Sequence, residues 1–406
     1  MTEGLVLQYD PFDATIAADP YPIYDWLRDE APVHHAPVTD TFVLSRYDDV
    51  AWALGDTDLF SSDAMRGVLL GQPTGVGEQR LPREAAMGTL VSVDPPAHTE
   101  LRRIVNRGFT PRRIGDWHGR IEEIIAELLS GLSPGDTFDV IGGLAAPLPV
   151  QVIAELLGAG VEAAAQFRQW ADALTRAMSG SARGGMFGEE PLQAMFSLAS
   201  YLGQRIEERQ RQPSDDLLST LVRAHGDEVL GQEEALGFAG LLLFAGTETS
   251  TNLIGNAAWA LLHHPDELGA TRGDPTRVPA VLEETLRWES PVQYVFRRTT
   301  RPVERHGVRI PVDAVITLLL GAANRDPRHW GDDADRFDAD RVTSGHLAFG
   351  FGPHFCLGAA LARAEAGLAL NRLLDHLDGC QMPAGDDELI DSLQFRGRRQ
   401  LEIVVP

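Results

Sequence analysis

Apolar residues recur every three or four positions along most of the chain, which is the spacing of amphipathic helices. Helices are therefore predicted over Tyr21–Asp29, Ile114–Leu132, Pro149–Leu157, Val161–Met178, Pro191–Gln210, Glu233–His263, Val278–Glu289 and Leu357–Leu377. Segments with the pattern of strands are few and short: Thr41–Leu44, His306–Ile310, Val315–Leu319 and Leu401–Val405. The pattern indicates a mainly α fold with small, separate β-sheets.

Two stretches interrupt the helical pattern. Ser61–Leu90 is too long for a simple connection, and loops of that length are usually functional or disordered. The Gly- and Ser-rich stretch Ser179–Gly188 lies between two predicted helices and resembles a mobile lid loop. No internal repeat, low-complexity tract or interdomain linker is visible. The length of 406 residues alone would favour more than one domain, because one hydrophobic core usually stops growing at about 250–300 residues.

Composition narrows the classes of function. The formal net charge of −24 argues against general nucleic-acid binding. Cys356 and Cys380 are the only cysteines, so a disulfide framework is not expected and a reducing cytosol is the natural compartment. The N-terminus lacks the basic and apolar parts of a signal peptide, and the longest apolar stretch, Ala235–Phe244, is too short to span a bilayer. We expect a soluble, cytoplasmic protein that binds neither nucleic acid nor membrane.

Cys356 lies in a segment with unusual local chemistry, Phe349–Leu370. Gly350, Gly352 and Pro353 prevent a regular helix before the cysteine, and the alanine-rich pattern after it is strongly helical. A sulfur at such a junction faces free backbone N–H groups and the positive end of the helix dipole, which favour thiolate over thiol. A buried structural cysteine is the ordinary alternative, but the spacing Phe-Gly-x-Gly-x-His-x-Cys-x-Gly is too specific for that role.

A second segment, Gly240–Gly255, is apolar almost all round yet carries polar residues in its middle. Buried polar groups cost free energy unless they are paired. Ala245 and Thr249 share a helix face with Gly246 between them, and such small residues leave a groove for a diatomic ligand. Thr249 would offer a hydroxyl there and Glu248 a carboxylate. The alternative is that the hydroxyls bond back to carbonyls four residues earlier and merely bend the helix.

Two further segments carry charges at helical spacing. After Pro95-Pro96, His98 and Arg102 stand four apart, which suits two donors that reach one carboxylate. The span 101–120 holds six arginines and one acid, and is either a solvated helix face or a docking patch for an acidic protein. Glu284 and Arg287 are three apart and can pair, although such pairs are commonly just exposed.

These segments, in this order, resemble the cytochrome P450 superfamily of haem-thiolate monooxygenases. The haem-binding loop of the family is matched at Phe349, Gly352, His354, Cys356 and Gly358. The resemblance implies that Cys356 is the thiolate ligand of a haem b iron, which favours O–O cleavage.

The resemblance also implies ligands for the haem propionates. These are His98, Arg102, Arg297 and His354, with Arg298 as the alternative to its neighbour if the register slips.

The same resemblance implies roles for the two remaining motifs. Ala245-Gly246-x-Glu248-Thr249 matches the central helix of the family, in which the acid–alcohol pair delivers protons during oxygen activation. Glu284 and Arg287 match a structural Glu-x-x-Arg pair that joins a later arginine, for which we expect Arg336, although the usual proline of that segment is absent.

By this resemblance, residues 1–406 form the family's single, triangular, mainly α domain, which overrides the estimate from length. We expect a monomeric enzyme that inserts one atom of O2 into an apolar small molecule, such as a terpenoid, steroid, polyketide or fatty acid. We expect no fused flavin or iron–sulfur module, so that electrons would come from a separate ferredoxin and ferredoxin reductase.

Three alternatives remain open. The first is a haem enzyme driven directly by hydrogen peroxide, and the second a non-catalytic haem- or ligand-binding protein. The Glu248–Thr249 pair argues against both, because relatives of the first kind commonly lack it and a binder needs no proton relay. The third, a structural zinc site, would need more ligands than two cysteines and His354 supply.

The sequence does not reveal the substrate. Segments that line the pocket in the family contribute mostly apolar residues, each of which would be equally suited to the core: Met65, Leu69, Leu70, Leu242, Val292, Val295 and Phe395. An apolar pocket accepts many classes of substrate.

Overall fold

The computed structural model describes residues 9–10, 13–65, 89–160, 163–182, 189–214, 216–222, 230, 232–377, 379–380, 388–392 and 394–405. Its helices are α1 (Ala14–Ala18), α2 (Tyr21–Glu30), α3 (Tyr47–Gly55), α5 (Ala97–Val105), α6 (Pro111–Leu128), α7 (Pro147–Leu156), α8 (Ala164–Ala182), α9 (Glu189–Arg211), α10 (Leu217–Val222), α11 (Gln232–His263), α12 (Pro265–Gly273), α13 (Val278–Trp288), α14 (Leu320–Ala323), α15 (Pro327–Trp330) and α16 (Ala359–Leu377). Its strands are β1 (Val33–Ala36), β2 (Thr41–Leu44), β3 (Phe60–Ser61), β4 (Thr137–Asp139), β5 (Tyr294–Thr299), β6 (Val303–Arg305), β7 (Val308–Ile310), β8 (Val315–Leu319) and β9 (Glu402–Val404).

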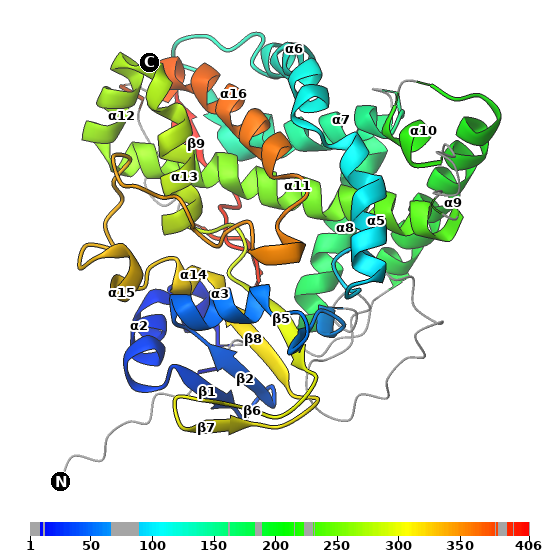
Figure 1. The fold of residues 1–406 in the computed structure, drawn as a ribbon. Coiled ribbons are helices and arrows are strands. Elements are labelled where there is room, and N and C mark those ends of the chain that lie inside the picture. Colours follow the sequence, from blue (N-terminus) through cyan, green and yellow to red (C-terminus); the bar gives the residue numbers. More distant parts are fainter. Residues whose placement is uncertain are drawn as a thin grey trace.

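The long helix α11 runs through the middle of the helical part of the molecule (Figure 1). It packs against α7, α8, α9, α13 and α16, which together enclose the largest apolar core. A helix that is apolar on all sides is stable only when other elements cover every side. Among the described helices, none is long and apolar enough to cross a membrane.

The β-structure lies mainly beside α2 and α3, away from the helical core (Figure 1). Its main sheet has the order β1-β2-β8-β5-β3, with β2 parallel to β8 and the other pairs antiparallel. All five residues of β8 are buried, as expected for a central strand. Two antiparallel pairs, β4–β9 and β6–β7, complete the β-structure of the described residues.

The eight predicted helices are all present, with ends that differ by a few residues. One of the two largest errors, of four residues, concerns α6, which was predicted to continue to Leu132 but ends at Leu128. Gly131 has a φ of +94°, a left-handed conformation that stops a helix and that glycine adopts without strain. The predicted mainly α fold with small sheets is confirmed.

The four predicted strands are all present, β2 and β8 with the predicted bounds and β7 and β9 in shortened form, and five strands of the described residues were missed. The predicted strand His306–Ile310 starts only at Val308, because His306 and Gly307 form the turn between β6 and β7 with φ values of 50° and 75°. The most important missed strand is β5, in which the paired charges Arg297 and Arg298 hide the apolar pattern.

Glu365 of α16 is a carboxyl group buried within this helical core. It is 1% exposed, its Oε1 has no hydrogen-bond partner, and it contacts Ser250 of α11. Burial raises the pKa of Glu365 to about 8, against an ordinary value of 4.5. The folded protein therefore holds this proton at neutral pH, whereas the unfolded chain releases it.

Glu365→Gln should remove a pH dependence of stability. Between the unfolded and folded pKa values, the folded state binds more protons than the unfolded state, so wild-type stability falls as pH rises from about 4.5 to 8, by up to about 1.4 kcal/mol per pH unit. Urea unfolding of both proteins across this range measures the difference. Asp375→Asn, at an exposed position of the same helix, is the control. The difference between its free energy of unfolding and that of wild type should not vary with pH over this range. A wild-type curve parallel to that of Glu365→Gln would contradict the prediction.

Candidate active site

The loop before Cys356 is shaped by glycines. Gly350 and Gly352 have φ values of 72° and 71°, and the Cys356 N–H donates to the Phe349 carbonyl at 2.8 Å. A Cβ on Gly352 would lie 3.1 Å from the Leu54 carbonyl oxygen of α3, so this position has neither the conformation nor the space for a side chain. The loop therefore holds Cys356 just ahead of α16, close to the predicted loop-to-helix junction.

Burial adds an effect to the electrostatic surroundings of Cys356 that the sequence did not show. Its side chain is accessible on one side but otherwise surrounded by protein, and this burial raises the pKa of the thiol. Backbone N–H groups of Gly358 and Ala359 and the guanidinium groups of Arg102 and Arg363 oppose the rise without cancelling it. The helix start favours the thiolate, as predicted, but desolvation has the larger effect on the thiol. A coordinated metal ion would deprotonate the thiol outright.

Four cationic or ionisable donors gather beside this loop. The rings of His98 on α5 and His354 on the loop are 4.0 Å apart, and Ser62 Oγ lies 3.0 Å from His354 Nε2. Both ring nitrogens of His98 are buried without a hydrogen-bond partner. Burial, followed by the charges of Arg297, His98 and Arg102, lowers the pKa of His354 to about 3. The cluster therefore presents unused donors and positive charge to one region.

Arg297, and not Arg298, belongs to this cluster. Arg297 is buried in β5, its Nη1 donates to the Phe296 carbonyl at 2.8 Å, and its Nε has no partner. Burial lowers its pKa to about 10, opposed by nearby Asp94. Arg298 instead points to Asp63, with Nε 3.1 Å from the carboxylate.

The four donors fit a ligand that carries two carboxylates, such as a haem with its propionates. Among the described residues, no carboxylate forms an ion pair with any member of this donor set: His98, Arg102, Arg297 and His354. Unpartnered buried donors are rare in folded proteins, because each costs the free energy of its lost hydration. An anionic ligand would satisfy them.

On α11, the hydroxyl groups bond back along the helix. Thr249 Oγ1 donates to the Ala245 carbonyl at 2.7 Å and Thr247 Oγ1 to the Leu243 carbonyl at 2.8 Å. Ala245 is nonetheless exposed, whereas Leu243 beside it is fully buried. An accessible alanine inside a core helix marks the face on which Ala245 and Thr249 lie as the wall of an interior space.

The neighbours of Thr249 serve different purposes. The Glu248 carboxylate lies 3.4 Å from Asn252 Nδ2 and is half-buried. Gly246, expected to help form a groove, faces α7, where a Cβ would lie 3.1 Å from Ile153. Its small size is thus explained by helix packing, and the groove-facing residues are Ala245 and Thr249.

Glu284 and Arg287 of α13 form a fully buried, two-pronged ion pair. Arg287 Nε and Nη2 each donate to the Glu284 carboxylate at 2.7 Å, and both side chains are 0% exposed. The prediction that Arg336 is the third member of this network is wrong. Its side chain is exposed, and only its carbonyl takes part, accepting from Arg287 Nη2 at 3.1 Å. The nearby arginine is Arg341, whose Nε lies 3.5 Å from Glu284.

Most of the apolar residues considered for a substrate pocket belong to cores. Leu242 is buried in the helical core, whereas Met65, Val292 and Val295 pack against the two clusters at the sheet. Phe395 differs because its ring meets Phe244 of α11 edge-on, with centroids 5.9 Å apart. Leu69 and Leu70 lie outside the described residues.

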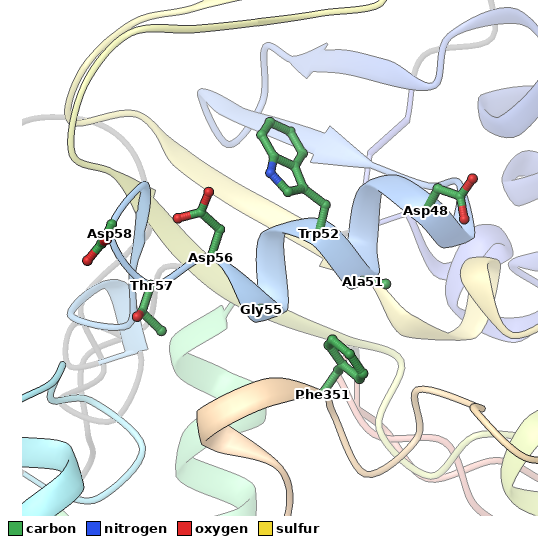
Figure 2. A pocket seen from close by; sticks show the side chains of 8 residues that line it. All are labelled: Asp48, Ala51, Trp52, Gly55, Asp56, Thr57, Asp58 and Phe351. Atoms are coloured by element: carbon green, nitrogen blue, oxygen red, sulfur yellow. The ribbon is translucent and has the colours of Figure 1, made fainter.

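An open pocket of about 740 Å³ lies on the other side of the cysteine loop. Figure 2 shows Phe351 pointing toward α3, and Asp48, Asp56 and Asp58 are among the residues that line the pocket. None of its lining residues belongs to the donor cluster or to α11. This pocket is therefore separate from the candidate active site.

Sequence reasoning missed two partners of the site. Ser62 contacts His354, and the Ser62 N–H donates to Asp94 at 2.7 Å, which ties β3 to the start of α5. Ser62 and His354 are 292 residues apart, so no spacing in the sequence could have revealed their contact. Glu289 is the second residue that sequence reasoning missed. It is a buried hydrogen-bond acceptor, and nothing in the sequence marked it beyond its position directly after Trp288.

Known proteins resemble this chain over its whole length. The family model described as Cytochrome P450 matches residues 276–401. Cytochrome P450 107B1 from Saccharopolyspora erythraea is 38% identical over 99% of both chains. Vitamin D(3) 25-hydroxylase from Pseudonocardia autotrophica is 37% identical over 98% of this chain and 96% of that protein. The solved structure of CYP109Q5 from Chondromyces apiculatus has a TM-score of 0.86 and 37% identity, and covers 98% of this chain and 99% of that one. The chain therefore belongs to the cytochrome P450 family and is a haem b monooxygenase.

Proposed function

We propose that this P450 monooxygenase oxidises an apolar small molecule at the face of α11 that carries Ala245 and Thr249. The observation that supports the proposal most strongly is the donor cluster beside Cys356, in which the ring nitrogens of His98 and the Nε of Arg297 are buried without a partner. It predicts that Cys356 ligates the haem iron while His98, Arg102, Arg297 and His354 hold the propionates. We further propose that residues 1–406 act as one monomeric unit in the cytoplasm.

Bound haem supplies the activation of O2 with two electrons, so that one oxygen atom enters the substrate and the other leaves as water. The protein's part is to hold and move protons. Thr249 lies on the same face of α11 as the accessible Ala245, and the half-buried Glu248 directly precedes it in the chain. Thr249 would turn its hydroxyl from the Ala245 carbonyl toward the reacting oxygen, and Glu248 would resupply the proton.

The substrate class that we propose is steroid-like or terpenoid, with polyketides and fatty acids as further members of the apolar range. One relative is a hydroxylase of vitamin D(3), a secosteroid, at 37% identity. The aromatic pair Phe244–Phe395 gives this side of α11 an apolar wall. Adding testosterone, vitamin D3, lauric acid or a macrolide separately to the ferric protein and recording the Soret band tests this. A shift with lauric acid alone would contradict the steroid-like assignment.

We propose a separate ferredoxin and ferredoxin reductase as the source of electrons. Phe351 and Phe355 of the cysteine loop are 51% and 40% exposed, and Arg103 and Arg112 lie exposed on α5 and α6. Arg120 does not add to this surface, because it is bound to Glu155 at 2.8 Å. Exposed apolar and basic side chains of this kind suit an acidic donor, whose association would weaken with salt.

Thr249→Ala should uncouple electron consumption from product formation. Oxidation of NAD(P)H in the reconstituted chain is expected to continue, while product per NAD(P)H falls about tenfold or more and hydrogen peroxide accumulates, because general acid catalysis typically contributes 10²–10⁴-fold. Quantifying product, peroxide and NAD(P)H in the same reaction measures this coupling.

Thr247→Ala is the matched control. Thr247 makes the same bond to the carbonyl four residues earlier but is buried on another face, so this variant should stay coupled. Equal coupling in wild type and Thr249→Ala would exclude the proton role. Turnover with peroxide alone that matches the ferredoxin chain would favour the peroxide-driven alternative, and haem and substrate binding without product would favour a non-catalytic binder.

A further inference from the structure

Glu289, the residue after α13, is the centre of a buried network of charges. Its carboxylate accepts from Arg396 Nε at 2.7 Å, Arg398 Nη2 at 3.1 Å, Arg325 Nη2 at 3.4 Å and the Tyr21 hydroxyl at 2.7 Å. Burial alone would raise the pKa of Glu289, but its cationic partners lower it to about 2. The carboxylate is therefore ionised and holds three arginines from two distant segments.

This network fixes the turn that contains Phe395. The Arg396 N–H donates to the Pro291 carbonyl at 2.9 Å, and Phe395 forms a β-bridge with Val292. Asn256 Nδ2 of α11 donates both to the Glu289 carbonyl at 3.1 Å and to the Arg396 carbonyl at 3.0 Å. The turn is thus tied to α11 and to the end of α13 on both sides of Phe395.

The turn packs against α11 so closely that there is no room for a side chain at Gly397. A Cβ on Gly397 would lie 1.9 Å from Asn252 Oδ1, so only glycine permits this approach. Phe395 is 9% exposed, and its ring lies edge-on to Phe244, the residue before the accessible Ala245. The Phe395 ring therefore lies beside the turn of α11 that carries Ala245.

We infer that Glu289, acting through Arg396, positions Phe395 and thereby sets the size of the ligands that fit beside Ala245. Glu289 and Arg396 are positioning residues, since neither faces that space, whereas Phe395 is the residue that restricts size. The inference rests on the proposed function, in which ligands of the haem iron enter at this face.

Two iron ligands of different size test the inference in the haem-loaded protein. Imidazole and 4-phenylimidazole bind iron through the same nitrogen, and the red shift of the Soret band reports each Kd. The ratio of the two Kd values measures the available space, independently of turnover. Phe395→Ala should favour 4-phenylimidazole by about tenfold relative to imidazole, as expected for a ring-sized change in an apolar pocket. Phe395→Leu, which alters the core less, should change the ratio in the same direction by a smaller factor.

Arg396→Lys keeps the charge but loses the Nε–H that bonds Glu289 at 2.7 Å. It should shift the Kd ratio in the direction of Phe395→Ala, and it should have no further effect when combined with Phe395→Ala. Arg398→Lys is the matched control, because Arg398 binds the same carboxylate but stacks on Trp259 at 3.9 Å, away from Phe395. It should lower the unfolding temperature without changing the ratio.

The outcomes separate the two levels of the proposal. An unchanged ratio in Arg396→Lys, or an equal change in Arg398→Lys, would overturn the positioning role and leave the haem site intact. A shift by Arg396→Lys that persists without Phe395 would show that another residue restricts size, and would also overturn the inference. If wild type shows no red shift with imidazole, the proposed site fails and this inference fails with it.

Discussion

Cys356→Ser is expected to abolish the thiolate-type Soret band of the reduced carbon monoxide complex and to lower product formation by more than about 100-fold. Loss of a residue that merely supports a metal ligand costs about 10–100-fold, and loss of the ligand itself should cost more. A serine oxygen is a harder and weaker donor than sulfur, so it does not supply the electron density that favours O–O cleavage. The loop itself should survive the change, since its shape depends on Gly350 and Gly352 and on the backbone bond from residue 356 to the Phe349 carbonyl.

Cys380→Ser provides a control of identical chemistry. Cys380 follows the end of α16 and is the other cysteine of the chain. The control should keep both the band and the activity, and both variants should unfold at the temperature of wild type. A Cys356→Ser protein that retained the thiolate-type band would show that another residue ligates the iron.

The helices were predictable because their signal is local. The chain repeats apolar residues at the helical period, and each packed helix needs that stripe whatever its neighbours are. Strand β5 escaped notice because Arg297 is buried, which a sequence pattern assigns to the surface. Its burial depends on a cluster formed with α5 and the cysteine loop, which only the assembled fold brings together.

Site residues that belong to a sequence motif could be predicted. Contacts between residues that are far apart in the sequence and share no motif could not. His98 and His354 are 4.0 Å apart in the structure as the resemblance implied, although 256 residues separate them. The effect of the helix start on Cys356 was visible in the sequence, whereas the burial that opposes it was not. Glu289 contacts Arg398, which lies 109 residues later in the chain, and neither the charges nor the spacing in the sequence predicts this contact.

The choice between Arg336 and Arg341 shows the same limit. Both follow α13 in one acid-rich segment, so the sequence places two arginines equally well. The path of the folded chain determines which arginine lies near the pair. The Arg336 carbonyl accepts a hydrogen bond from Arg287, whereas the side chain of Arg341 lies beside Glu284.

Arg287→Leu is expected to destabilise the protein by about 3–5 kcal/mol, because it leaves the Glu284 carboxylate charged, buried and without its partner. The loss extends further, since Arg287 also donates to the carbonyls of Asn324 at 2.9 Å and Ala334 at 2.7 Å. A cost of this size is a large part of the stability of a typical domain, about 5–15 kcal/mol, so the yield of folded protein should fall as well. The urea midpoint of the apoprotein measures the effect without reference to haem.

A double-mutant cycle with Glu284→Leu separates the ion pair from its surroundings. Each single substitution leaves one buried charge without its partner, whereas Glu284→Leu/Arg287→Leu removes both charges. The double variant should therefore be more stable than the sum of the two single losses predicts. Arg211→Leu is the control, since Arg211 and Glu207 form an exposed pair on α9 with 74% and 53% of the side chains accessible, and its cost should stay below about 0.5 kcal/mol. If the losses at Glu284 and Arg287 simply add, the pair is not the source of the stability, and the bonds from Arg287 to the carbonyls must carry it instead.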